Sequence, residues 1–273
     1  MKYRPQEEHE KAFCKLFDQL TYSRSSWQVW EDLMTVMACS IANAGAPQDE
    51  KWKKREELYK RAISDLGDPD IPAKIFGEVI GALEDKPDQD FLGALYMNLN
   101  LGSHWHGQFF TPYNICHMMA KMQMEDAKAR IDEQGWISVC DTCIGGGAML
   151  IAAANVLKEQ GINYHNHVLF VGQDLDPVVA KMAYIQLSLL GCPGYIAIGD
   201  SLTTPMTGHP LFPEDREGLE YWITPFFRSD AWEYRKLWIR MDRIFAKPKK
   251  QFTFYFDFGK EEPYVGSSIE RAG

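Results

Sequence analysis

Three aspartates, each placed just after a short apolar run, constrain this chain more than any other feature of its sequence. They are Asp141, Asp174 and Asp200. Each run has the length of a buried strand, and helical sequence separates one run from the next. This alternation predicts an α/β fold with a parallel sheet and helices on both of its faces. Ligands of such sheets bind at the carboxyl ends of the strands, where all three carboxylates are expected to lie.

A glycine-rich turn follows the first aspartate. Gly145, Gly146 and Gly147 come soon after Asp141, and the helical apolar pattern of Ala148–Glu159 begins directly behind them. Glycine has no Cβ, so the turn can approach a ligand closely and aim backbone N–H groups and the helix N-terminus at it. The signal is weak by itself, because a tight strand-to-helix connection has the same sequence.

The second aspartate favours ligand binding. Asp174 lies about one βα unit beyond the glycines, where a carboxylate can accept hydrogen bonds from both hydroxyls of a ribose. Asp176 and Pro177 come next and have the order of an N-cap and a first-turn proline for a helix over 178–190. We therefore expect Asp174 to bind the ligand and Asp176 to cap the helix.

The composition limits the class of protein. The chain has 273 residues, of which 45% are hydrophobic, a mean hydropathy of -0.33 and a net charge of -9. These values predict a globular protein with one large domain and a smaller one. No apolar stretch is long enough to cross a membrane and the N-terminus lacks a signal-peptide core, so we expect a cytoplasmic protein without membrane contact.

The six cysteines are scattered through hydrophobic runs, and we expect them to be free thiols. Cys140 and Cys143 have the spacing of a metal or redox pair. No second pair completes a zinc ligand set, and small side chains pack well beside the glycines, so we predict no metal site. Four methionines are expected to fill a core: Met118, Met119, Met122 and Met124.

One basic and aromatic-rich stretch stands out against the acidic background. It begins at Arg228 and ends at Lys250, with Trp232, Tyr234 and Trp238 among its basic residues. Such a stretch can follow a phosphate backbone and stack on bases, although the net charge argues against binding by bulk electrostatics. The alternative is an amphipathic helix with tryptophans in the core and arginines in water. Both interpretations stay open.

The order of patterns predicts a helical N-terminal domain over 1–100, an α/β domain over 101–260 and a flexible tail over 261–273. Expected helices are 6–20, 25–44, 48–66, 71–84, 91–99, 113–124 and 230–245. Two further strands are expected over 219–223 and 252–258. An unpaired strand such as 252–258 invites association, and a partner subunit or a homodimer could cover it. The alternative is that this strand is internal to the sheet and the strand order differs.

Four segments together resemble the N-6 adenine-specific DNA methyltransferase family, and within it the modification subunits of type I restriction systems. They are 107–112, 141–147, 172–177 and 199–202, and the resemblance covers roughly residues 88–230. It implies a Rossmann-like sheet that binds S-adenosylmethionine, with DNA as the substrate. A carboxylate-rimmed, aromatic-lined pocket also suits a sulfonium cation better than a pyrophosphate, which disfavours a nicotinamide-dependent oxidoreductase.

The resemblance also implies roles for individual residues. Asp174 would hold the ribose hydroxyls, and Asp200, with Ser201 beside it, would recognise the adenine of the cofactor. Asp141, Gly145 and Gly147 would line the methionine and ribose. Three residues would lie over the methionine end: Phe110, Thr111 and Pro112.

The chain departs from the family at the catalytic motif. After its fourth strand the family carries Asn-Pro-Pro-Tyr or Asn-Pro-Pro-Phe, which holds a flipped target base. The nearest equivalent here follows a predicted strand and consists of Thr224, Pro225, Phe226 and Phe227. A threonine hydroxyl reaches less far than an asparagine amide, and losing such an oriented contact commonly costs ~2 to 4 kcal/mol of transition-state stabilisation.

Two functional hypotheses follow. In the first, the chain transfers a methyl group from S-adenosylmethionine to the N6 amino group of adenine in DNA, and residues 224–227 form a degenerate base pocket. In the second, it is a catalytically inactive S-adenosylmethionine-binding homologue that acts as a regulatory or assembly partner.

Overall fold

The computed structural model describes residues 5–101 and 110–245. The chain divides into two compact units, Met1–Lys236 and Leu237–Gly273. The predicted strand over 252–258 and the predicted tail lie outside the described residues. The division into a domain over 1–100 and another over 101–260 stays a prediction.

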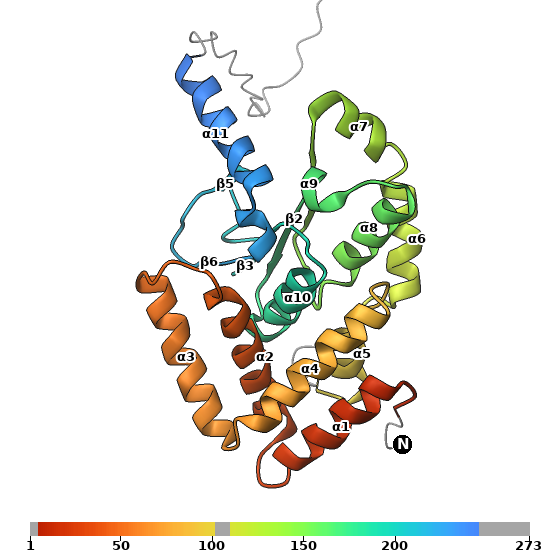
Figure 1. The fold of residues 1–273 in the computed structure, drawn as a ribbon, viewed down its shortest axis with the longest axis vertical. Coiled ribbons are helices and arrows are strands. Elements are labelled where there is room, and N and C mark those ends of the chain that lie inside the picture. The colour runs from red at the N-terminus through yellow and green to blue at the C-terminus, as the bar shows by residue number, and fades with distance from the viewer. Residues whose placement is uncertain (1–4, 102–109, 246–273) are drawn as a thin grey trace, which may run out of the picture. The chain divides into compact units, whose positions relative to one another are not determined.

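The first part of the chain is helical, as its sequence pattern indicated. The helices are α1 (Glu8–Leu20), α2 (Ser26–Asn43), α3 (Glu50–Leu66), α4 (Asp70–Asp85) and α5 (Phe91–Asn98). Their ends were predicted closely because polar residues cap them: the side chains of Ser25, Asp49 and Asp90 each accept a hydrogen bond from a first-turn N–H. Figure 1 shows these five helices gathered on one side of the sheet.

Strands and helices alternate from residue 113 onward. The elements are α6 (Tyr113–Gln123), α7 (Ala127–Gln134), β1 (Ile137–Asp141), α8 (Ala148–Glu159), α9 (Tyr164–His167), β2 (Val168–Asp174), α10 (Pro177–Leu189), β3 (Gly194–Ile198), β4 (Gly208–His209), β5 (Phe212–Pro213), β6 (Glu220–Ile223), the 3₁₀ helix η1 (Pro225–Arg228) and α11 (Asp230–Phe245). The sequence did not predict α7, α9, β4, β5 or η1, since these short elements bury too few side chains to show a period.

The four-stranded sheet has the order β1-β2-β3-β6. β1, β2 and β3 run parallel, whereas β6 is antiparallel to β3. Asp141 pairs with Gly172 and Asp174 with Ile198, so the carboxyl ends of the three parallel strands meet at one edge of the sheet. Among the described residues, no strand pairs with the other edge of β1.

The helices α8 and α10 both lie on one face of the sheet. On this face Tyr184 of α10 packs edge-on against Trp222 of β6, and Ile144 reaches the Cα of Gly172. The opposite face is covered by the segment after β3, because the Tyr195 hydroxyl donates to the carbonyl of Pro210. The Tyr195 ring also packs against Phe227 of η1, and Phe227 packs against Trp232 of α11, so helical residues lie on this face as well.

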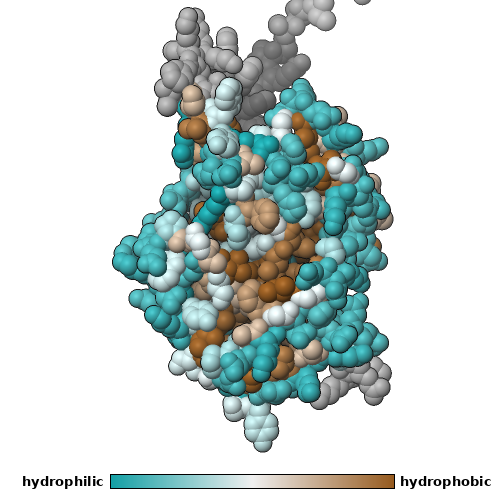
Figure 2. Space-filling model, viewed as in Figure 1, coloured by the Kyte–Doolittle hydropathy of each residue, from teal (hydrophilic) through white to brown (hydrophobic). Residues whose placement is uncertain are grey.

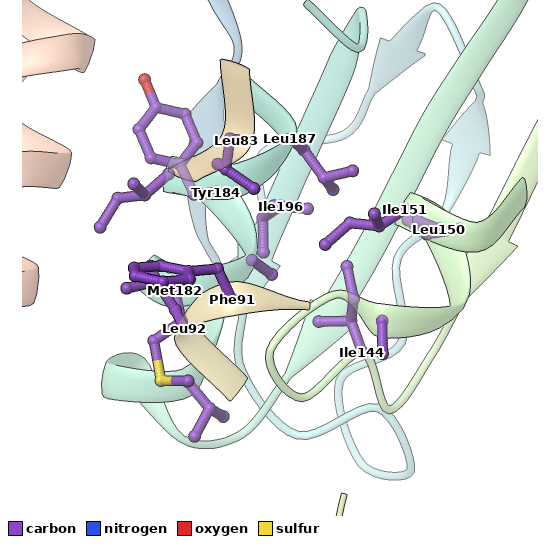
Figure 3. Packing of buried hydrophobic residues seen from close by; sticks show 14 of the residues in the cluster. Leu83, Phe91, Leu92, Ile144, Leu150, Ile151, Met182, Tyr184, Leu187 and Ile196 are labelled. Carbon is purple, nitrogen blue, oxygen red and sulfur yellow. The ribbon is translucent and has the colours of Figure 1, made fainter. Parts of the chain in front are cut away.

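One hydrophobic core runs from Phe13 in α1 to Trp222 in β6. Figure 3 shows Leu92, Ile144, Ile151 and Ile196 converging from α5, the glycine turn, α8 and β3. In Figure 2, hydrophobic residues also reach the surface over the region where Figure 1 places α10, and hydrophilic residues frame them. The core thus joins the N-terminal helices to the sheet.

The methionines of α6 correct one expectation. Met118 and Met122 are 54% and 73% exposed and Met119 is 37% exposed, while only Met124 of this group is buried. The prediction that all four fill a core was wrong, because the buried face of α6 is the one that carries Cys116 and Ala120. No helix among the described residues has both the length and the apolar character needed to span a bilayer.

Candidate cofactor site

The three predicted carboxylates lie at the carboxyl ends of the parallel strands. Asp141 and Asp174 are the last residues of β1 and β2, and Asp200 follows β3 by two residues. The N–H of Gly199 donates to the carbonyl of Asp174 (2.8 Å), which brings the turn before Asp200 against the end of β2. The strand pattern of the sequence therefore located this edge of the sheet.

The Asp174 carboxylate connects the end of β2 to the glycine turn and to the start of α10. Its Oδ2 accepts from the N–H of Gly145 (2.8 Å) and its Oδ1 accepts from the N–H of Asp176 (3.0 Å). Burial raises the pKa of the Asp174 carboxyl, the two backbone bonds lower it, and Asp176 and Asp141 raise it further. Each carboxylate oxygen has a second lone pair, so the group can still accept hydrogen bonds from ligand hydroxyls.

The glycine turn needs glycine at two positions. Gly145 and Gly147 have φ values of +53° and +97°, and a Cβ on Gly147 would lie 3.2 Å from the Cα of Ala183 in α10. The N–H groups of both are used inside the protein, by Asp174 Oδ2 and by the carbonyl of Ile144. The turn therefore fixes the backbone shape of the site, and these two N–H groups are already bonded within the protein.

The N-termini of α8 and α10 differ. Asp176 accepts from the N–H of Val178 (2.8 Å) with Pro177 at the first position of α10, so the predicted cap is confirmed. Gly147 precedes α8 and provides no side-chain cap. The partial positive charge at the N-terminus of α8 therefore has no side-chain cap.

Phe110 lies over the glycine turn. A Cβ on Gly145 would be 3.2 Å from the Phe110 ring, and that ring stacks on Tyr96 of α5 with centroids 5.3 Å apart. Thr111 and Pro112 are exposed at the start of α6. The structure therefore brings Phe110, Gly145 and Asp174 into one group.

A hollow of about 340 Å³ is lined by residues of β1, α6 and α8, and its lining does not include Phe110, Gly145 or Asp174. Its lining includes Thr111, Asp141, Cys143, Val139 and Met149. Asp141 is half-buried, its Oδ1 accepts from the N–H of Cys143 (3.0 Å), and burial raises the pKa of its carboxyl. Thr111 and Asp141, which were both predicted to contact the methionine of the ligand, line the same hollow.

Asp200 is held by its own turn. Its Oδ1 accepts from the N–H groups of Leu202 (2.8 Å) and Thr203 (3.3 Å), and these bonds hold the pKa of the carboxyl below its usual range. The Leu202 N–H is therefore already bonded to Asp200. Ser201, between Asp200 and Leu202 in the chain, is partly buried. Leu202 and Leu175 are 90% and 67% exposed, so two apolar side chains project near the ends of β3 and β2.

The structure places Thr224 away from these residues. Because β6 is antiparallel to β3, Thr224 lies beside Gly194 at the amino end of β3, opposite to the carboxylates. The Thr224 side chain is 1% exposed; its hydroxyl donates to the carbonyl of Cys192 (2.7 Å) and accepts from the N–H of Gly194 (2.9 Å). Pro225 and Phe226 are exposed, and Phe227 is buried. These four residues and the cofactor-side group are not brought together.

Most of the described part of the basic stretch forms α11, in which one tryptophan is buried and two aromatic rings are exposed. Trp232 is fully buried and donates from Nε1 to the carbonyl of His165 (2.8 Å), while Arg235 lies over its ring at 4.8 Å. Tyr234 and Trp238 are 71% and 74% exposed. The end of the stretch at Lys250 lies outside the described residues.

Sequence reasoning missed two buried glutamines next to the site. Gln173 donates to the carbonyls of Gly199 and Thr204, and Gln186 donates to Asp90 and to the carbonyl of Gly146. Both are 0% exposed. Gln186 stands between Ile185 and Leu187 in the mostly apolar helix α10. That pattern is the signal that could have revealed it, since a buried amide requires partners.

Among the described residues, Asp88, His117 and Glu159 bring possible metal-ligand atoms within 4.8 Å of one another. Lys121 also contacts Glu159 at 3.3 Å, and the Tyr113 hydroxyl donates to Asp88. Lys121 therefore pairs with the charge of Glu159, while Asp88 accepts from a neutral hydroxyl. The prediction that the chain has no metal site stays a prediction.

Comparison with known proteins gives a family match. The model of the family described as N-6 DNA Methylase matches residues 90–256, which is more than half of the chain. The methylase subunit of the type I restriction enzyme MjaIX from Methanocaldococcus jannaschii is 28% identical over 95 residues, covering 35% of this chain. The matched region spans only 15% of the length of that relative.

Two solved structures are also similar. One is the type I restriction-modification methyltransferase subunit from Streptococcus thermophilus, with 15% identity, a TM-score of 0.38, and coverage of 73% of this chain and 59% of that one. The other is a protein from Listeria monocytogenes described as a class I S-adenosylmethionine-dependent methyltransferase, with 16% identity, a TM-score of 0.37, and coverage of 85% and 79%.

Proposed function

This chain belongs to the N-6 DNA methylase family, and we propose that it binds S-adenosylmethionine at the carboxyl ends of β1, β2 and β3 and transfers the methyl group to the N6 amino group of adenine in DNA. The observation that carries the proposal is the pairing of Asp174 with the Gly145 N–H below the Phe110 ring. The carboxylate, the tight turn and the aromatic ring come from three separate segments and meet at one point.

The chemistry of these residues fits the cofactor. Asp174 has acceptor capacity for two ribose hydroxyls, and the N-terminus of α8 suits the methionine carboxylate. Leu175 and Leu202 offer apolar surface to a purine face, and Asp200 lies beside them as an acceptor. The bound cofactor supplies a methyl group on a sulfonium sulfur, a cation that Asp141 and the Phe110 ring suit.

Binding is tested by titration calorimetry with S-adenosylmethionine and with its demethylated product. We expect binding of both by the wild-type chain. Asp200→Ala should weaken binding less than Asp174→Ala, because Asp200 is the more exposed of the two carboxylates. If neither compound binds, the cofactor assignment is lost.

Transfer is tested with methyl-labelled cofactor and mixed-sequence DNA. Labelled N6-methyladenine should appear in the DNA, with the chain alone or with an added partner subunit. The relatives described as methylase subunits motivate the second arm of this experiment. A cytoplasmic location belongs to the same proposal.

One observation favours a second function, cofactor binding without transfer. Thr224 uses both its donor and an acceptor site within the β3–β6 pairing, at the end of the sheet opposite to the carboxylates. A regulatory or assembly partner would retain the cofactor site and lose the base pocket. Cofactor binding with no labelled product in either arm would favour this second function.

DNA contact belongs to the same proposal. Tyr234 and Trp238 are exposed aromatic rings on α11, within the stretch that begins at Arg228. Stacking on an aromatic ring is worth ~1 to 3 kcal/mol per base. We expect Trp238→Ala to weaken binding of single-stranded DNA about tenfold in a fluorescence titration, with Tyr22→Ala, another exposed tyrosine, as the control.

A further inference from the structure

Gln186 is a buried polar side chain in α10, a helix that is mostly apolar. It is 0% exposed, and α10 around it is almost wholly buried. Its Nε2 donates to Asp90 Oδ1 (2.7 Å) and to the carbonyl of Gly146 (2.8 Å), and its Oε1 accepts from the N–H of Leu92 (3.0 Å). One amide group thus joins α10, the start of α5 and the glycine turn.

Asp90 continues this connection. Its Oδ1 also accepts from the N–H of Gly93 (2.9 Å), which makes Asp90 the N-cap of α5. A Cβ on Gly146 would lie 3.4 Å from Asp90 Oδ1 and 3.5 Å from the Cα of Gly93, so the turn packs directly on the first turn of α5. Gly146 is therefore held by a hydrogen bond on one side and by close packing on the other.

The same helix reaches the site a second time. Tyr96, one turn beyond Gly93 in α5, stacks on Phe110, and Phe110 lies over Gly145. Hence α5 supports both the floor of the site, at Gly146, and its aromatic cover, at Phe110. The residues that support the site from α5 and α10, which are Asp90, Tyr96 and Gln186, lie outside the four motif segments of the sequence.

We propose that Gln186 and Asp90 are positioning residues for cofactor binding: they fix the glycine turn against α5, so that Gly145, Asp174 and Phe110 are arranged before the ligand arrives. Preorganisation of this kind raises affinity, because the residues are already ordered in the free protein and binding does not have to supply the free energy of ordering them. The inference rests on the proposed binding of S-adenosylmethionine and adds the N-terminal helix α5 to the residues that determine its affinity.

Gln186→Met is the first test, since methionine keeps the length of the side chain and removes its donors. We expect the Kd for S-adenosylmethionine to rise about tenfold by calorimetry, ~1.4 kcal/mol. Gln160→Met is the matched control: it removes a bond from Nε2 to the carbonyl of Met124 at the other end of α8. Val79→Ala, in the core of α4, is the control for lower stability. Both controls should keep Kd within about twofold of wild type.

Asp90 provides a second pair of variants, in case Gln186→Met does not fold. Asp90→Ala removes the acceptor and should raise Kd about tenfold, whereas Asp90→Asn retains a side-chain oxygen and should restore binding to within about threefold of wild type. A purely structural role predicts that Kd follows the melting temperature across all variants, and that outcome would overturn the proposal.

A readout without cofactor separates this proposal from the proposed function. In the free protein, hydrogen exchange of the amides over 144–149 should speed up in Gln186→Met and Asp90→Ala and stay unchanged in Gln160→Met. If wild type fails to bind S-adenosylmethionine, the proposed function fails whatever the exchange shows. If wild type binds, and the two variants bind equally well with unchanged exchange, the positioning role is refuted.

Discussion

Asp174, Asp200 and Asp90 are the same side chain in three environments, and their surroundings give them different tasks. Asp174 is half-buried and uses each oxygen once on a backbone N–H, which leaves acceptor capacity for a ligand. Asp200 is more exposed, with its charge stabilised by the N–H groups of its own turn. Asp90 is buried and serves the protein interior.

The first prediction at this scale concerns Asp174. Asp174→Ala should raise the Kd for S-adenosylmethionine about 10- to 100-fold, because hydrogen bonds to a charged group are worth ~1.5 to 3 kcal/mol. Calorimetry measures the change. Asp18→Ala, at a carboxylate on α1, is the control and should leave Kd unaltered; an unchanged Kd in Asp174→Ala would remove the ribose contact from the proposal.

The second concerns Asp90 and pH. Burial raises the pKa of the Asp90 carboxyl above its ordinary value, with the bonds from Gln186 and Gly93 opposing this. The folded state therefore keeps the proton to higher pH, so the stability that Asp90 contributes is full below about pH 3.9 and is lost as the pH rises through the folded pKa. The free energy of unfolding of Asp90→Asn relative to wild type should increase over that rise, as measured by urea unfolding. A pH-independent difference would contradict this.

The third concerns Thr224. Its buried hydroxyl makes two bonds across the β3–β6 junction, so Thr224→Val should lower the free energy of unfolding by ~1 to 3 kcal/mol. Cofactor affinity should not change, because the site lies at the other end of the sheet. Denaturant unfolding measures the loss of stability, and calorimetry measures the cofactor affinity. If Thr224→Val lost methyl transfer without losing stability, the result would instead support the hypothesis that Thr224 belongs to the base pocket.

At the scale of elements, the contact between α8 and α10 sets the shape of the glycine turn. Gly147 has a left-handed φ, and a Cβ added to it would lie 3.2 Å from Ala183. Gly161, after the other end of α8, has φ +74°, and an added Cβ would have nothing within 4 Å. Gly161→Ala thus adds backbone strain alone. Gly147→Ala adds strain and a clash between two helices.

We therefore expect Gly161→Ala to cost about 1 kcal/mol and Gly147→Ala about 2 to 4 kcal/mol of unfolding free energy. Only Gly147→Ala should also weaken cofactor binding. If urea unfolding gave the same loss of unfolding free energy for the two variants, α10 would accommodate the added methyl group beside Ala183 without strain.

At the scale of the whole molecule, the N-terminal helices and the sheet share one core. The buried cluster includes Trp30 of α2, Phe91 of α5 and Ile196 of β3 without interruption. The bond between Gln186 and Leu92 adds a polar link between the two halves. The proposed function uses both halves, since Tyr96 supports Phe110 over the cofactor turn.

Residues 1–236 are accordingly expected to unfold in a single transition. Circular dichroism and tryptophan fluorescence should give coincident curves in urea, because tryptophans such as Trp30 and Trp222 lie in both halves. Two separated transitions would support independent domains over 1–100 and 101–260.

The sequence by itself determined the alternation of elements and the edge where ligand chemistry gathers. Period and capping residues act locally, which is why α5, α8, α10 and the aspartates at the ends of β1 and β2 could be predicted. Only the tertiary structure decided how strands pair and which polar groups meet. The antiparallel pairing of β6, which carries Thr224 to the far end of the sheet, and the contact of Gln186 with Asp90 join residues far apart in the chain, and no local pattern encodes them.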